Sequence, residues 1–149
     1  MHFHFLLSES RSRDRSKRAN ATYTARLKQA AKLAATIEFA SIEEVELHAI
    51  LLSDAELLEL NRSALGHDWL TDIITFEIER AAELLQAEIY LSVDRARENA
   101  RRYHVSLLQE LEHLVIHGML HLAGMKDKTP LQKKQMRARE RWYLAKLRE

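Results

Sequence analysis

Apolar residues recur at three- and four-residue spacing from Ala21 to Ile37, and this pattern predicts an amphipathic helix. Further helices are predicted where a serine or threonine precedes an apolar-periodic segment, because its side chain can accept a hydrogen bond from a free backbone N–H at a helix start. Each of these helices is predicted to begin after its capping residue. The predicted helices run from Ser53 to about Ala64, from Ser92 to Arg102, from Ser106 to about Leu122, and from Thr129, which is followed by Pro130, for the last helix.

Runs rich in branched and aromatic residues predict four strands. They are residues 2–7, Val45–Ser53, Thr71–Ile78 and Glu88–Ser92, with a loop and some local helix expected between the last two. Strands and helices therefore neither alternate strictly nor segregate, which suggests an α+β fold. We predict one domain over residues 1–149, with a single mixed β-sheet of about four strands packed with about five to six helices.

Composition and charge narrow the class of protein. The 149 residues are 46% hydrophobic and 30% charged, as in an ordinary globular protein, and the formal net charge is +1. Bulk charge therefore does not draw this chain to nucleic acid, and local basic clusters would have to do so. Such clusters are Arg11, Arg13, Arg15, Lys17 and Arg18; Arg95, Arg97, Arg101 and Arg102; and Lys133, Lys134, Arg137, Arg139 and Arg141.

The chain contains no cysteine, so a metal site must use histidine, aspartate, glutamate or water. The opening MHFHFLLSES has too short an apolar run for a secretory signal. No stretch approaches the roughly 20 apolar residues that a membrane span needs. We expect a soluble cytoplasmic protein that does not act at a membrane.

The stretch HGMLHLAGMKD, from His117 to Asp127, carries the candidate chemistry. Residues four apart share one face of a helix, so His117 and His121 can direct two imidazoles at one ion. His113 lies on the same face, but roughly 12 Å of helix separates it from His121, so the three histidines cannot share an ion. The ion must therefore be bound either by His113 and His117 or by His117 and His121.

Gly124 selects the later pair, because glycine readily adopts the left-handed conformation that ends a helix and turns the chain back. That turn would bring Asp127 to His117 and His121. We therefore predict a metal site at the end of a helix, with three protein ligands and one position left for water, as in catalytic zinc sites. Zn²⁺ is the expected single divalent ion, although a carboxylate ligand also tolerates manganese or nickel.

This spacing matches the metzincin peptidase motif His-Glu-x-x-His-x-x-Gly-x-x-His, with aspartate in the last place. In those peptidases the glutamate after the first histidine polarises the zinc-bound water. Gly118 stands there and has no side chain, which argues against a peptidase. A phosphodiester is still a suitable substrate, because an ion can bind a phosphoryl oxygen and RNA carries its own 2′-hydroxyl nucleophile.

The same stretch resembles the signature of the YbeY endoribonucleases, bacterial rRNA maturation factors, whose usual form is His-Gly-x-Leu-His-Leu-x-Gly-Tyr-Asp-His. Two further blocks, LNRSALGHDWLTDIITFEI (Leu60–Ile78) and AEIYLSVDRARENA (Ala87–Ala100), are similar to other segments of that family and follow in its order. The resemblance covers most of the chain from about Val45 onward. Asp127 replaces the family's last histidine, in a variant associated with the Bacteroidetes branch.

The resemblance implies a metal-dependent, single-strand-specific endoribonuclease that acts in small-subunit ribosomal RNA maturation and ribosome quality control. His117, His121 and Asp127 would be its metal ligands and its catalytic residues. The implied partners are ribosomal RNA or small-subunit precursors, with ribosomal proteins or assembly GTPases as further candidates.

The resemblance also suggests residues that bind substrate. Thr71 and Asp72 match a segment that borders the family's cleft. The family's arginine, however, aligns with Leu65, so Arg62 and His67 are the nearby side chains that could replace it.

Two alternatives stay open at this point. The first is a non-catalytic, metal-stabilised ribosome-assembly or RNA-binding factor, which Leu65 in place of arginine favours. The second is a metallohydrolase acting on another substrate, such as a peptide, which Gly118 disfavours. On the last helix, Trp142 and Tyr143 are predicted to belong to the core.

Overall fold

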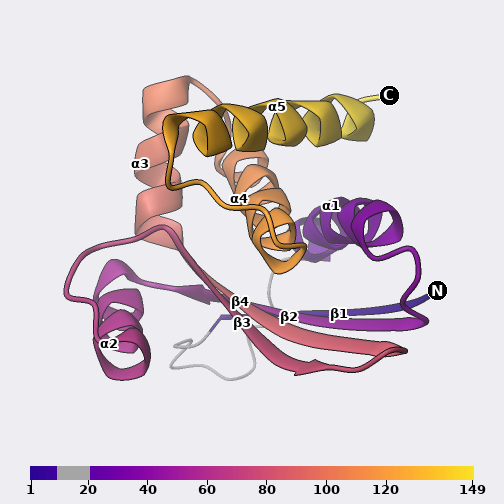
Figure 1. The fold of residues 1–149 in the computed structure, drawn as a ribbon. Helices are drawn as coiled ribbons and strands as arrows, with labels where there is room; N and C mark the ends of the chain where they lie inside the picture. Colours follow the sequence, from indigo (N-terminus) through magenta and orange to yellow (C-terminus); the bar gives the residue numbers. More distant parts are fainter. Residues whose placement is uncertain (10–20) are drawn as a thin grey trace.

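The structure is a computed structural model, and it describes residues 1–9 and 21–149. Within these residues the elements follow the predicted order (Figure 1). The strands are β1 (His2–Glu9), β2 (Glu44–Leu52), β3 (Ile73–Arg80) and β4 (Leu84–Ser92). The helices are α1 (Ala21–Glu38), α2 (Asp54–Leu65), α3 (Val93–Tyr103), α4 (Leu107–Leu122) and α5 (Pro130–Leu147). The first basic cluster, from Arg11 to Arg18, lies outside the described residues.

The strands form one mixed sheet in the order β1-β2-β4-β3. β1, β2 and β4 are parallel, whereas β3 pairs antiparallel with β4 at one edge. In register, Val45 of β2 lies between Phe3 of β1 and Leu85 of β4. The predicted α+β fold with a single four-stranded mixed sheet is confirmed, with five helices in the described part of the chain.

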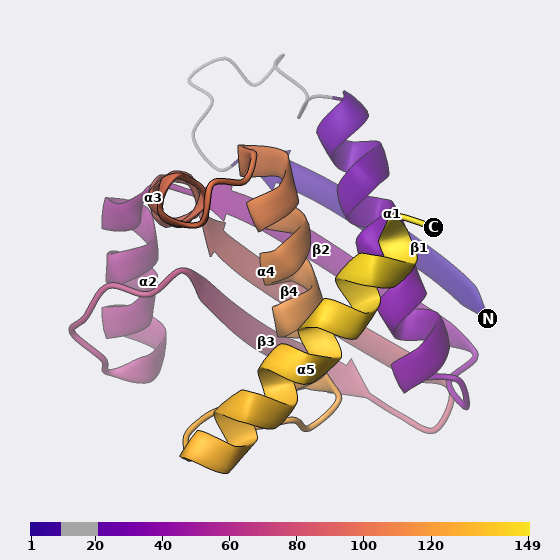
Figure 2. The same ribbon diagram turned by 90° about the horizontal axis from the view of Figure 1, so that it is seen from above.

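Helices α1 and α4 cover one face of the sheet, and α5 crosses above them as a further layer (Figures 1 and 2). The side chains of β2 and β4 that are buried beneath these helices are Val45, Leu47, Ala49, Leu51, Leu85, Ala87, Ile89 and Leu91. On the opposite face, Leu57 of α2 packs against Ile50, Leu52 and Ile74. None of the helices in the described residues is long and apolar enough to cross a bilayer.

Capping residues fix the helix starts, as predicted. The Oγ of Ser106 accepts a hydrogen bond from the backbone N–H of Gln109 at 3.1 Å, and the Gln109 side chain accepts one from the Ser106 N–H at 2.9 Å. Equivalent capping boxes at Ser53 and Thr129 open α2 and α5. Because these interactions are local, they set the start of α4, and thereby the face its histidines present.

The connection between β3 and β4 differs from the prediction. Instead of a loop with local helix, only residues 81–83 join the two strands, and the Ala81 N–H donates to the Leu84 carbonyl at 2.8 Å. Alanine, glutamate and leucine favour helix in this segment. The prediction of local helix is wrong because Leu85 and Ala87 pair with strands on both sides, and this pairing outweighs the intrinsic preference.

The two aromatic residues predicted to lie in the core of α5 have different environments. Tyr143 is fully buried, and its hydroxyl donates to Glu38 at 2.8 Å. The prediction is wrong for Trp142, which is 40% exposed and lies against the side chains of Arg139 and Lys146. Adjacent residues on a helix point about 100° apart, so only one of the two can face the core.

Candidate metal centre

The end of helix α4 positions the three predicted ligands. His117 and His121 lie one turn apart on one face, and Gly124 follows with a φ of +99°. The N–H groups of Gly124 and Met125 donate back to carbonyl oxygens of the last helical turn, at 2.9 and 3.0 Å. This Schellman arrangement ends the helix and reverses the chain. Asp127 therefore lies beside both histidines, as its spacing predicts.

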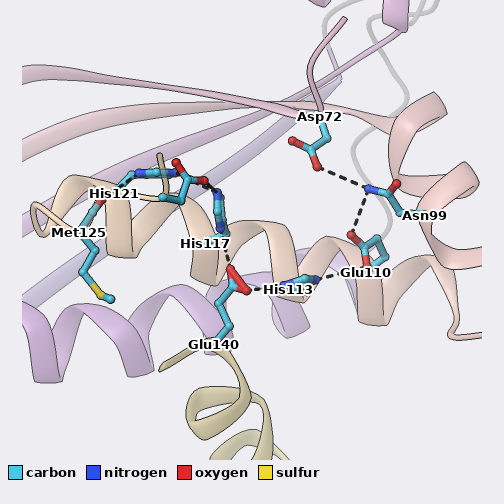
Figure 3. A network of polar contacts seen from close by, with 9 residues as sticks. Asp72, Asn99, Glu110, His113, His117, His121, Met125 and Glu140 are labelled. Atoms are coloured by element: carbon cyan, nitrogen blue, oxygen red, sulfur yellow. Dashed lines mark hydrogen bonds and ion pairs between the residues drawn. The ribbon is translucent and has the colours of Figure 1, made fainter. Parts of the chain in front are cut away.

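Three potential ligand atoms converge at this point. Oδ2 of Asp127 lies 3.4 Å from Nε2 of His117 and 3.4 Å from Nε2 of His121. The two Nε2 atoms are 2.9 Å apart (Figure 3). Ligands about 2.0–2.1 Å from a tetrahedral ion lie roughly 3.4 Å from one another. The group can therefore hold one metal ion with little rearrangement.

The second nitrogen of each ring is held by a hydrogen bond that determines its tautomer. Nδ1 of His121 lies 3.0 Å from the carbonyl oxygen of Met125, which can only accept, so this nitrogen carries the proton. Nδ1 of His117 lies 2.6 Å from Oε2 of Glu140, and an ionised carboxylate likewise accepts. Each neutral ring therefore presents a bare Nε2 to the site.

Two bare nitrogens and a carboxylate oxygen facing one another are all acceptors. At 2.9 Å the lone pairs of two Nε2 atoms repel each other unless a metal ion or a proton lies between them. Hydrogen bonds from the far side of ligating histidines, to a carboxylate or a carbonyl, are the usual support of metal sites. The donor set therefore fits a divalent ion.

Glu140 links the centre to His113. This carboxylate is only 5% exposed, and its other oxygen lies 3.0 Å from Nε2 of His113. Burial alone would raise the pKa of Glu140, but hydrogen bonds from His113 and His117 outweigh it and lower the pKa to about 2. For His113, burial favours the neutral ring, but hydrogen bonds to Glu110 and Glu140 prevail and raise its pKa to about 10. His113 is thus a charged partner of these carboxylates, and the prediction that it does not share the ion is consistent with this.

A pocket of about 240 Å³ opens beside the centre. His117, Asp127 and Glu140 line it on one side. Asp72 and Asn99 approach it from the sheet edge and α3, and an Nδ2–H of Asn99 lies 3.4 Å from Asp72 (Figure 3). Lys133 and Arg137 of α5 also line the pocket and bring positive charge to it.

Gly118 faces away from this pocket. A Cβ at this position would lie 2.8 Å from Cδ1 of Ile73, 3.0 Å from Cδ1 of Ile89 and 3.2 Å from Cγ2 of Thr75. The glycine thus allows α4 to lie close against β3 and β4. A side chain at residue 118 would meet the sheet, so it could not act as a base towards a substrate in the pocket.

The four residues predicted to bind substrate are separated in the structure. Asp72 lines the pocket. Thr71 instead donates its hydroxyl to the Ile73 carbonyl at 3.2 Å, and His67 stacks on Trp69 with ring centroids 4.2 Å apart. Arg62 pairs with Asp68. Thr71, His67 and Arg62 are not among the described residues that line this pocket. Their role in substrate binding stays a prediction.

Sequence reasoning missed Glu140, Glu110 and Asn99. A signal for Glu140 was present: Met136, Glu140 and Tyr143 recur at helical spacing, and all three are buried. A carboxylate within a buried helical stripe needs a partner, which indicates a network. No comparable pattern marks Asn99, whose side chain reaches Glu110 and Asp72 only through the packing of α3 on α4.

Several known proteins are similar to this chain in sequence or in structure. The family model described as Endoribonuclease YbeY matches residues 9–148. The Endoribonuclease YbeY of Cytophaga hutchinsonii is 44% identical over 96 residues, covering 64% of this chain and 67% of that protein. The Endoribonuclease YbeY of Amoebophilus asiaticus is 41% identical over 100 residues, covering 67% of this chain and 68% of that protein. A solution structure of a Thermotoga maritima protein has a TM-score of 0.61 at 25% identity, covering 96% of this chain and 88% of that one.

Proposed function

Since this chain belongs to the YbeY endoribonuclease family, we propose that its endoribonuclease activity depends on one divalent metal ion held by His117, His121 and Asp127. The observation that carries this proposal is the convergence of one carboxylate oxygen and two imidazole nitrogens, whose rings are oriented by Glu140 and Met125. Zn²⁺ is the ion we expect, because two imidazoles and one carboxylate are a common catalytic zinc set.

The bound ion would supply Lewis acidity towards a phosphoryl oxygen of RNA. Glu140 holds the Nδ1 proton of His117, so that Nε2 stays available as a ligand. Lys133 and Arg137 of α5 line the same pocket and bring positive charge to it, so they could hold the phosphates flanking the scissile bond.

A phosphodiester suits this pocket better than a peptide. Amide cleavage needs a proton donor for a poor leaving group, and position 118, which carries that function in metzincins, faces the sheet. RNA requires less of the protein, because its 2′-hydroxyl can act as the nucleophile. Single-stranded RNA is the substrate we propose, since an unpaired strand can enter a pocket of this size.

Small-subunit ribosomal RNA and its precursors, in the cytoplasm, are the proposed setting of the reaction. What supports this is the resemblance of the three sequence blocks to rRNA maturation factors, together with membership of the endoribonuclease family. Ribosomal proteins or assembly GTPases are the further partners that we propose on the same ground.

The proposal is tested by cleavage of a structured small-subunit rRNA fragment. Zinc-loaded protein should cut its single-stranded parts, and His117→Ala should reduce the rate to background. His4→Ala is the matched control, because His4 is an exposed histidine on β1, away from the pocket, and it should cleave at the rate of the unaltered protein. Equal cleavage by both variants would show that the activity does not arise at this centre.

A non-catalytic assembly factor is the second candidate, and one observation favours it. Leu65 replaces the family's arginine at the end of α2, where it is 43% exposed and can offer no guanidinium. If the chain binds small-subunit precursors equally well with and without His117, and cuts none of them, this candidate replaces the nuclease.

A further inference from the structure

A second hollow adjoins the metal pocket. It has a volume of about 340 Å³ and lies between α5 and the junction of α3 with α4. Tyr103, Glu110, His113, Arg137 and Glu140 line both hollows. The two therefore form one continuous groove that leads away from Asp127 and His117 along α5.

The far part of this groove combines an apolar floor with a basic rim. Val105, Leu144 and the 60% exposed ring of Tyr103 provide apolar surface. Arg141 and Arg148 line it, together with Arg137 nearer the metal centre. Residues 137, 141 and 148 lie within about 40° of one another around a helix of 3.6 residues per turn, so they follow one edge of the groove.

Among the residues that the structure describes, the arginines of this edge have no side-chain partner. Within residues 1–9 and 21–149, the guanidinium groups of Arg137, Arg141 and Arg148 make no hydrogen bond or ion pair. Arg139 of the same helix shows the contrast, because it bonds to Glu38 at 3.0 Å and lies over the ring of Trp142. The packing of α5 therefore uses Arg139, whereas the groove arginines are free to bind an anion.

Tyr103 shows a similar contrast with Tyr143. Tyr143 is fully buried and hydrogen-bonded, so its role is structural. Tyr103 ends α3, is 60% exposed, and lines the same hollow as the three arginines that have no partner among the described residues. An exposed aromatic ring next to free guanidinium groups is the combination that holds an unpaired base and its phosphates.

We propose that this groove binds a nucleotide that flanks the scissile phosphate of single-stranded RNA, with its base stacked on Tyr103 and its phosphates held by Arg141 and Arg148. The inference rests on the proposed function, since continuity with the metal pocket makes the groove a path for the same strand. A paired base cannot leave its stack to reach Tyr103, so the groove would select unpaired RNA.

Base stacking is tested by fluorescence anisotropy with a labelled oligouridylate of about 12 nucleotides, in chelator so that the RNA is not cut. Tyr103→Ala should weaken binding about tenfold or more, and Tyr103→Phe should leave it within about twofold, because phenylalanine keeps the stacking face. The same sequence in a full duplex should bind Tyr103→Ala and the unaltered protein equally. Circular dichroism confirms that both variants are folded.

Phosphate contacts are tested by the salt dependence of the same binding. The slope of log affinity against log salt is negative, and Arg141→Ala should reduce its magnitude by about 0.7. This change corresponds to the loss of one phosphate contact with single-stranded nucleic acid. Arg97→Ala is the matched control, because it removes an equal charge from an exposed site on α3 outside both hollows, and it should leave the slope unchanged.

The outcomes separate this inference from the proposed function. If the unaltered protein binds and cuts RNA while Tyr103→Ala and Arg141→Ala bind like the unaltered protein, the groove assignment is wrong and the nuclease stands. If Arg97→Ala reduces the magnitude of the salt slope as much as Arg141→Ala does, diffuse charge explains the binding and the groove assignment is again refuted. If the unaltered protein does not bind the oligonucleotide in chelator and, loaded with zinc, does not cut it, both proposals fall.

Discussion

At the scale of single residues, Glu140 has the largest expected effect on metal binding apart from the ligands themselves. Its carboxylate is buried and holds Nδ1 of His117 at 2.6 Å, which fixes the ring with Nε2 towards the site. Glu140→Gln keeps the shape but removes the charge, so zinc affinity should fall about 10- to 100-fold. Competition with a chromophoric chelator measures this affinity.

The control for Glu140→Gln is Glu98→Gln, which makes the same chemical change at a half-exposed position on α3. It should bind zinc like the unaltered protein. Equal affinities in all three proteins would show that Glu140 does not support the metal ligands.

Gly118 gives a prediction about stability rather than metal binding. Any side chain here meets Ile73, Ile89 and Thr75 of the sheet, so Gly118→Leu should lower the free energy of unfolding by about 1–3 kcal/mol or more. Urea denaturation measures the change. Gly66→Asn is the control, because nothing lies within 4 Å of a Cβ there and asparagine tolerates its φ of +67°. A leucine variant with an unchanged midpoint would refute the close packing of α4 on the sheet.

The site residues that sequence could predict are those whose relation is local. His117, His121, Gly124 and Asp127 are joined by one helical turn and one chain reversal, and both follow from residue spacing. Glu140 could not be assigned a partner in this way, because its contact with His117 spans 23 residues and depends on how α5 crosses α4.

At the scale of elements, His113 and Glu140 connect α4 to α5 by an ion pair that depends on pH. The pKa of His113 rises from 6.5 to about 10 on folding, so its contribution to stability is complete below about pH 6.5 and is lost as pH rises towards 10. The pKa of Glu140 falls from 4.5 to about 2, so its contribution is complete above about pH 4.5 and is lost as pH falls towards 2.

Both contributions are therefore complete between about pH 4.5 and 6.5. Urea denaturation in chelator should give a free energy of unfolding that declines from pH 6.5 to 10, and His113→Gln should flatten this decline. The difference between the two proteins isolates His113 from other titrating groups. A decline of equal steepness in the variant would contradict the ion pair.

The start of a helix was predictable where a capping residue sets it, as at Ser106. The start of a strand was not predictable where pairing with neighbouring strands sets it. The strand β4 begins at Leu84 in a segment whose residues favour helix, because two neighbouring strands offer it partners at once. Contacts between distant segments decided this element, and a local pattern does not contain them.

At the scale of the whole molecule, metal binding should stabilise the fold. The ligands come from the end of α4 and the following turn, and Glu140 ties them to α5, so an ion that binds only the folded chain opposes unfolding of all three segments. Free zinc at 100 times its dissociation constant adds about 2.7 kcal/mol. For a chain of this size this corresponds to a rise in Tm of roughly 5–10 °C.

Differential scanning fluorimetry with and without zinc checks this rise, and His121→Ala should show almost none. A similar rise in His121→Ala would mean that zinc stabilises the protein from another site.

The fold as a whole was predictable from the order of its elements, since one mixed sheet with helices follows from that order. How α5 lies over α4 (Figure 2) was not predictable. Both hollows of the groove depend on this packing. The basic residues of α5 were visible as a cluster in the sequence, but only the packed structure separates Arg139, which is paired, from Arg137 and Arg141, which face the groove.

The central claim is that two imidazoles and one carboxylate bind a single cation. Equilibrium dialysis against zinc followed by elemental analysis tests it most directly. We predict one ion per chain for the unaltered protein and for His4→Ala, and none above background for His121→Ala. Stoichiometric zinc in His121→Ala, or none in the unaltered protein, would contradict the account.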